Sequence, residues 1–110
     1  MKELCLFFRK ANEMTQLMII EEFFEVKGKL ICVTGKHKFD VESINYLLGL
    51  IGKKVQIKSK SGIELETLIY DVEARPVCFG PPEKINLVFC FKEGIDKLKR
   101  EKESEIFLID

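Results

Sequence analysis

Four closely spaced lysines are the residues of this chain best suited to binding a charged ligand. They are Lys53, Lys54, Lys58 and Lys60. On a strand, Lys54, Lys58 and Lys60 would share one face, with alternate residues about 6 to 7 Å apart, a spacing that suits a phosphate backbone. Residues 27–60 hold eight lysines and two acids, although the chain as a whole has no net charge. The pattern predicts a nucleic-acid-binding surface, and the alternative interpretation is a solvated face that keeps a sheet soluble.

The remaining titratable residues do not form a recognisable catalytic set. His37 is the only histidine, which excludes a metal site built on two histidines. The carboxylates of Glu21, Glu22, Asp71 and Glu73 could pair as acid and base, but no pattern marks a cleft that would shift their pKa values. We therefore predict that the protein is not an enzyme and that it has no metal or other cofactor.

The four cysteines are not arranged as a metal site or an obvious disulfide framework. None lies in a C-x-x-C pair, and Cys32 and Cys90 fall inside apolar runs, where a thiol behaves as a small hydrophobe. Cys78 follows Pro76 and precedes two further prolines in an expected loop. Burial is the predicted role of Cys32 and Cys90, and Cys78 is the cysteine most suited to react.

Apolar residues alternate with polar ones over several short runs, which predicts strands. Val55 and Ile57 alternate with lysines and Gln56, and the turn-forming residues 60–62 separate this run from residues 65–72, so the two runs should form a hairpin. Residues 76–82 should form a loop because of their prolines and glycine. The further strands are expected at residues 24–26, 30–34, 85–91 and 106–109.

Three stretches have helical rather than alternating spacing. Residues 4–18 carry apolar side chains at helical intervals and predict an amphipathic N-terminal helix. A second helix should follow a cap at Asp40, and a third should span residues 95–102. The chain of 110 residues suits one domain, and we divide it into an N-terminal extension at 1–18 and a β domain at 19–110.

The sequence also sets expectations for where the protein works. Its apolar runs are shorter than the roughly 20 residues that a membrane helix needs. The first ten residues lack the small-residue cleavage site of a secretory signal. We therefore expect a cytoplasmic protein that has no membrane partner.

The order of the strands resembles the second domain of translational GTPases of the elongation factor Tu type. Residues 20–35, which begin Ile-Glu-Glu-Phe and end Val-Thr-Gly, are similar to the opening of that domain. Residues 52–57, 65–75 and 85–108 resemble its later strands, so that the likeness covers about residues 19–109. It implies an all-β fold, a small closed antiparallel β-barrel of about six strands with short accessory helices.

The resemblance also implies a binding surface. In that family the barrel helps to hold the aminoacyl end of transfer RNA and contacts the ribosome, beside a GTPase domain that this chain lacks. The residues that match the family's pocket are Glu21, Glu22, Phe24, Thr34 and Glu73. The chain departs from the family by an insertion at residues 42–50 and by Lys84 in place of an asparagine.

Two classes of function follow from these observations. The first is a non-catalytic binding module that contacts RNA or the ribosome and the wider translation machinery, which the resemblance and the basic segment favour. The alternative is a protein–protein interaction module: an adaptor, an immunity-like inhibitor or a self-associating barrel. The zero net charge and the apolar N-terminal stretch favour this alternative.

Overall fold

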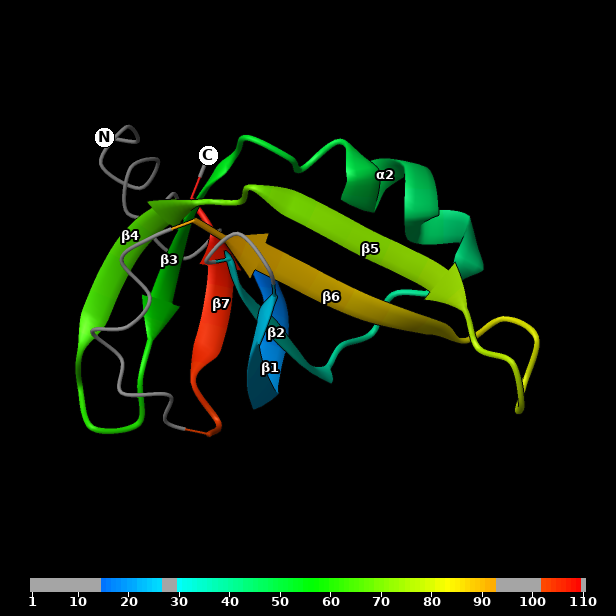
Figure 1. The fold of residues 1–110 in the computed structure, drawn as a ribbon, viewed down its shortest axis with the longest axis horizontal. Helices are drawn as coiled ribbons and strands as arrows, with labels where there is room; N and C mark the ends of the chain where they lie inside the picture. The colour runs from blue at the N-terminus through cyan, green and yellow to red at the C-terminus, as the bar shows by residue number, and fades with distance from the viewer. Residues whose placement is uncertain (1–14, 27–29, 93–101, 110) are drawn as a thin grey trace, which may run out of the picture.

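Strands dominate the part of the chain that the structure describes, as the alternating pattern predicted (Figure 1). The structure, a computed structural model, describes residues 15–26, 30–92 and 102–109. Its elements are the strands β1 (Thr15–Val26), β2 (Leu30–Lys36), β3 (Lys54–Lys58), β4 (Glu64–Leu68), β5 (Asp71–Pro76), β6 (Ile85–Phe91) and β7 (Glu105–Leu108), the 3-10 turn η1 (Val41–Ser43) and the helix α2 (Ile44–Leu48).

All seven strands of the described ranges belong to one antiparallel sheet. Its order is β4-β3-β7-β1-β2-β6-β5. The predicted hairpin is confirmed, since β3 pairs with β4 from Lys54 opposite Leu68 to Lys58 opposite Glu64. The last strand, β7, lies between β3 and β1, so it joins two groups of strands that are otherwise separate.

The sheet is not closed, and the expectation of a closed barrel is wrong. Within the described ranges β4 and β5 are the two outermost strands and do not pair with each other. The Ile69 N–H donates to the Lys53 carbonyl, whereas the next N–H, of Tyr70, donates to the Cys90 carbonyl. The chain therefore changes its pairing partner from β3 to β6 without reversing its direction. As a result, β4 and β5 lie end to end (Figure 1). Since β4 pairs only with β3 and β5 pairs only with β6, the strand order of the described residues stays open at both ends.

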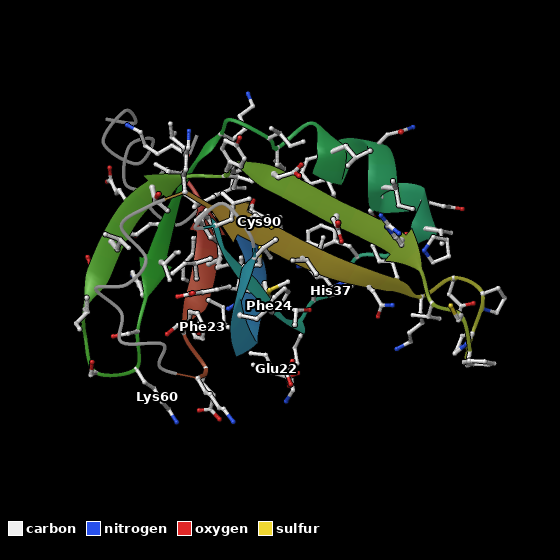
Figure 2. All side chains as sticks on the ribbon, viewed as in Figure 1. Glu22, Phe23, Phe24, His37, Lys60 and Cys90 are labelled. Atoms are coloured by element: carbon white, nitrogen blue, oxygen red, sulfur yellow. The ribbon has the colours of Figure 1, made fainter. Side chains whose placement is uncertain are left out.

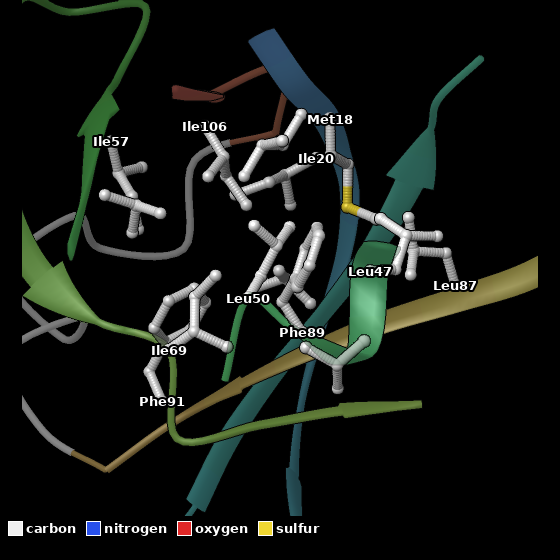
Figure 3. Packing of buried hydrophobic residues seen from close by; sticks show 14 of the residues in the cluster. Met18, Ile20, Leu47, Leu50, Ile57, Ile69, Leu87, Phe89, Phe91 and Ile106 are labelled. Atoms are coloured by element: carbon white, nitrogen blue, oxygen red, sulfur yellow. The ribbon is translucent and has the colours of Figure 1, made fainter. Parts of the chain in front are cut away.

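The core lies on the inner face of this sheet and beneath α2. Val55 and Ile57 of β3 are fully buried, as the alternation of that run predicted. In β6 the predicted inward face is also confirmed, because Leu87, Phe89 and Phe91 are each no more than 1% exposed. Figure 3 shows Leu87 and the two phenylalanines clustered with Leu47 of α2 and Ile106 of β7.

The helix predicted after Asp40 is present and lies within residues 42–50. The Glu42 N–H donates a hydrogen bond to the Asp40 side chain at 3.0 Å, and the Asp40 N–H donates to the Ser43 hydroxyl at 3.4 Å, which completes a capping box. Two residues later α2 begins, and it buries Leu47 against the sheet. The helix therefore covers β5.

The predicted N-terminal helix is wrong at residues 15–18, which belong to β1. The register of β1 with β7 shifts between Gln16 and Met18, and this bulge allows Leu17 and Met18 both to be buried. Two adjacent buried residues break the period of a strand and imitate that of a helix. The rest of that prediction and residues 95–101 of the third helix lie outside the described residues, and Lys102 is in a turn.

Candidate functional site

A groove of about 800 Å³ brings together residues from four separate parts of the chain. Ile19 and Ile20 of β1 contribute to its lining, and most of the other lining residues are charged. The charged lining residues are Lys36, Lys58, Lys60, Lys102, Glu21, Glu22, Glu103 and Glu105. Four lysines and four glutamates give the lining no net charge. Lys58 and Lys60 of the predicted lysine surface therefore line the same groove as Glu21 and Glu22 of the predicted pocket.

A bulge in β1 places the two glutamates in this lining. The register of β1 with β2 shifts between Ile20 and Glu22, and both Glu21 and Glu22 are exposed. Gly35 of β2 allows this close approach, because a Cβ there would lie 2.7 Å from the Glu21 backbone nitrogen. The Ile20 N–H donates to the Ser104 carbonyl at 2.7 Å, which brings the segment before β7 to the same groove.

Two ion pairs cross this lining. The Lys60 ammonium contacts the Glu103 carboxylate, and the Lys36 Nζ lies 3.9 Å from Glu21 Oε2. The hydrogen bond to Glu103, reinforced by its charge, raises the pKa of Lys60, and the same contact lowers the pKa of Glu103. All four side chains are at least half exposed, so water screens these pairs and a ligand can replace them at small cost.

The predicted lysine surface is interrupted by acids. Lys54, Gln56 and Lys58 share the outward face of β3, but Lys60 lies beyond that strand in a turn. Lys58 is directly opposite Glu64 on β4 and Glu105 on β7. Its ammonium also lies 5.6 Å from the centre of the Phe107 ring. The alternating glutamates of residues 64–66 were visible in the sequence, and the predicted hairpin places them opposite the lysines.

Four of the five predicted pocket residues gather on the outer face of the sheet. The register aligns Glu22, Thr34, Val88 and Glu73 in one row across β1, β2, β6 and β5. In the next row Phe24 lies opposite Cys32. Phe24 is 39% exposed and is therefore not a core residue (Figure 2). The fifth residue, Glu21, lies in the bulge beside Lys36.

Thr34 of this row forms a hydrogen bond to the backbone of β6. Its hydroxyl donates a hydrogen bond to the Leu87 carbonyl at 2.8 Å. The groove residues that the sequence did not single out are Lys36, Lys102, Glu103 and Glu105. No local signal marks them, because only the pairing of β7 with β1 and β3 brings Glu103 and Glu105 to Lys58 and Lys60.

Some kinds of site are absent from the part of the chain that the structure describes. No group of three or more His, Cys, Asp or Glu residues in the described ranges could hold a metal ion. A search of the same ranges for membrane spans finds no helix with the length and apolar character to cross a bilayer.

No protein-family model matches the chain, and comparisons with curated proteins and with solved structures also give no match. The resemblance to the second domain of elongation factor Tu therefore stays a prediction that depends on the residues quoted for it. The groove and the outer face of the sheet are the surfaces from which a function can be argued.

Proposed function

We propose that this chain is a non-catalytic protein–protein interaction module, and that its groove binds a segment of a partner protein that carries both positive and negative side chains. The observation that supports this is the balanced lining of four lysines and four glutamates. A polypeptide of mixed charge can pair with both kinds of side chain. A polyanion would gain the lysines but would also face the glutamates, and like charges that are brought together are destabilising.

The side chains that form ion pairs in the groove are exposed, so a bound partner can replace either member of a pair. Lys36 and Glu21 are 3.9 Å apart, with side chains 74% and 50% exposed. Such pairs contribute little stability by themselves, so that a partner can take either member without a large cost. Ile19, which is partly exposed in the lining, adds apolar area that a bound segment would cover.

The test is capture from a lysate by the immobilised chain, after nuclease treatment. The groove variant carries Glu21→Lys and Lys60→Glu, which reverse two exposed lining residues without changing net charge. The matched control carries Lys54→Glu and Glu66→Lys, which are exposed on the outward face of β3 and β4 and do not line the groove. We expect a defined protein to be retained by the wild type and the control and lost by the groove variant.

Equal retention by both variants would contradict the proposal that the groove is the binding site. Loss of capture upon nuclease treatment would show that RNA mediates it. Sedimentation of the purified wild type as a dimer, with the groove variant monomeric, would identify the partner as a second copy of the chain.

The second candidate is an RNA- or ribosome-contacting module, which the basic character around Lys53 and Lys54 favours. Both side chains are exposed, and Lys54 lies opposite Leu68 rather than an acid. If two to four phosphates are contacted, affinity for single-stranded RNA should fall with salt at a log–log slope of about −1.5 to −3.

A titration of labelled single-stranded RNA at several salt concentrations tests this candidate. The variant is Lys54→Gln, Lys58→Gln and Lys60→Gln, because a glutamate at position 58 would face Glu64 and Glu105. It should lose most of the affinity and flatten the salt dependence, whereas Lys38→Gln should leave both almost unchanged. Absence of salt-dependent binding by the wild type at low ionic strength would remove this candidate.

A further inference from the structure

Two cysteines lie directly opposite each other in the middle of the sheet. Cys32 of β2 pairs with Cys90 of β6 in the antiparallel register. Phe24 and Asp71 extend the same row on either side, so both thiols belong to the outer face. Figure 2 labels Phe24 and Cys90 of this row. Neither cysteine is part of the core cluster, whereas their chain neighbours Ile31 and Phe91 are.

The two thiols are buried although they lie outside the core. Cys32 is 1% exposed and Cys90 is 7% exposed, and both are unlinked. The thiols lie close enough for each to influence the pKa of the other. Directly opposed residues of an antiparallel pair have Cα atoms about 4.5 to 5.5 Å apart, within the span of about 4.4 to 6.8 Å that a disulfide requires.

We propose that Cys32 and Cys90 are a reversible dithiol–disulfide pair, a modification site that hydrogen peroxide or a small disulfide such as oxidised glutathione converts to a cross-strand link. The position of the thiols supports this, because directly opposed residues already have Cα atoms within the span that a disulfide requires. The link is independent of what the groove binds.

The reaction with peroxide balances without another cofactor. One thiolate attacks the peroxide, the O–O bond breaks, and a sulfenic acid and a water molecule form after proton transfer. The second thiol attacks that sulfur, the S–S bond forms, and the hydroxyl leaves as water. The two cysteines together lose two protons and two electrons, which reduce one peroxide to two waters. A dithiol reductant reverses the link by thiol–disulfide exchange.

The environment of the thiols predicts how the rate of their oxidation depends on pH. Burial raises the pKa of Cys32 and, more strongly, that of Cys90, and the nearby charges of Asp71 and Glu73 act in the same direction. Because the thiolate is the reactive form, oxidation should be slow at neutral pH and should accelerate about tenfold per pH unit through pH 9. An exposed thiol would instead level off near its ordinary pKa of about 8.5.

The link would also change the stability of the whole sheet. It joins β2 to β6 and closes a loop of roughly 60 residues, which restricts the unfolded chain. The oxidised protein should therefore melt at least about 5 °C above the reduced protein, given what a disulfide of this loop length contributes in a domain of this size.

The experiment uses the full chain with Cys5→Ser and Cys78→Ser, so that only the opposed pair remains. After peroxide treatment at pH 8 we expect a mass loss of two hydrogens, a linked peptide pair containing Cys32 and Cys90, the higher melting temperature, and full reversal by dithiothreitol. The same linked peptides should be found in the wild type. That result would show that the two serine substitutions do not cause the link. The Cys90→Ala variant should show no mass loss and no change in melting temperature.

Other outcomes would overturn the proposal. One is that treatment which fully oxidises glutathione leaves both thiols reduced, so that both are alkylated when the protein is then unfolded. Another is a link between two chains. A third is a linked protein that melts lower than the reduced one, since that would mean that the bond forms in unfolded chains and distorts the sheet.

Discussion

Gly35 is the residue at which the sequence of β2 most directly controls the shape of the groove. A Cβ at this position would collide with the backbone carbonyl of Ile19 and would lie 2.7 Å from the Glu21 nitrogen. These are backbone atoms at the β1 bulge, so they cannot move aside as the end of a side chain could. A glycine is therefore required for β1 and β2 to approach where Glu21 turns outward.

Gly35→Ala should lower the free energy of unfolding by about 2 kcal/mol or more, because the added methyl group forces the two strands apart. Chemical denaturation followed by circular dichroism measures this. Gly49→Ala is the matched control: Gly49 has φ −72°, and its nearest neighbour to an added Cβ is 3.3 Å away. That change should stay within about 1 kcal/mol, and equal effects of the two substitutions would contradict the assignment.

His37 is held as a neutral ring between two backbone groups. The Phe39 N–H donates to Nδ1 at 3.2 Å, so the proton is on Nε2, which lies 3.2 Å from the Ile85 carbonyl. Burial is the main cause that lowers the pKa of His37 below 6.5, the positive charge of Lys84 adds to this, and the Ile85 hydrogen bond opposes it. A second proton would also cost the hydrogen bond from Phe39.

Because the pKa of His37 is lowered in the folded state, the free energy of unfolding depends on pH. Above pH 6.5 both the folded and the unfolded states hold a neutral His37, and the stability that this residue provides is complete. As the pH falls below 6.5, the unfolded state binds a proton first and the free energy of unfolding decreases. His37→Gln should flatten this decline between pH 6.5 and 5, above the range in which most carboxylates titrate. Superimposable curves for the two proteins in urea denaturation would contradict this role.

Among the elements, the short η1–α2 segment depends on its cap more than a long helix would. The segment spans residues 41–48, and a helix this short is marginal by itself. Its stability therefore comes from the Asp40 hydrogen bonds at its start and from the burial of Leu47.

Asp40→Ala should cost about 1 kcal/mol of unfolding free energy, because the Glu42 N–H loses its acceptor. Thermal or urea denaturation at pH 7 measures the difference. Glu42→Ala changes an exposed residue of the same turn and should shift stability by no more than about 0.5 kcal/mol. A larger effect of Glu42→Ala than of Asp40→Ala would show that the cap is not the stabilising feature.

At the scale of the whole molecule, the stability of the sheet depends on β7. Ile106 of β7 is fully buried and lies opposite Ile57 of β3 and Met18 of β1. The β3–β4 hairpin joins the other four strands through β7 alone within the described sheet order. Local pairing can form the hairpin early, but the complete sheet requires contacts between the two ends of the chain.

Ile106→Ala should remove about 2 to 5 kcal/mol of unfolding free energy, a large part of the stability of a domain of this size. The matched control is Leu68→Ala, since Leu68 is 55% exposed and lies on the outermost strand β4. This control should cost less than about 1 kcal/mol. If both variants unfold at the same urea concentration, then β7 does not hold the two groups of strands together.

The sequence by itself determined the elements whose patterns are local. The alternation at Val55 and Ile57 and along residues 85–91 follows from one buried face and a two-residue period. The turn before β4 contains Gly62 at φ 102°, a conformation that glycine adopts without strain. The Asp40 cap is local for the same reason, since it links atoms only two and three residues apart.

Only the tertiary structure decided the features that depend on distant partners. The bulges of β1, the break between β4 and β5 and the central place of β7 all result from backbone hydrogen bonds to other strands. Nearly every residue carries the same backbone N–H and C=O groups, so the types of side chain give little indication of which strands will pair. The groove and the opposed Cys32 and Cys90 form where those pairings bring distant residues together, which is why neither could be found from spacing along the chain.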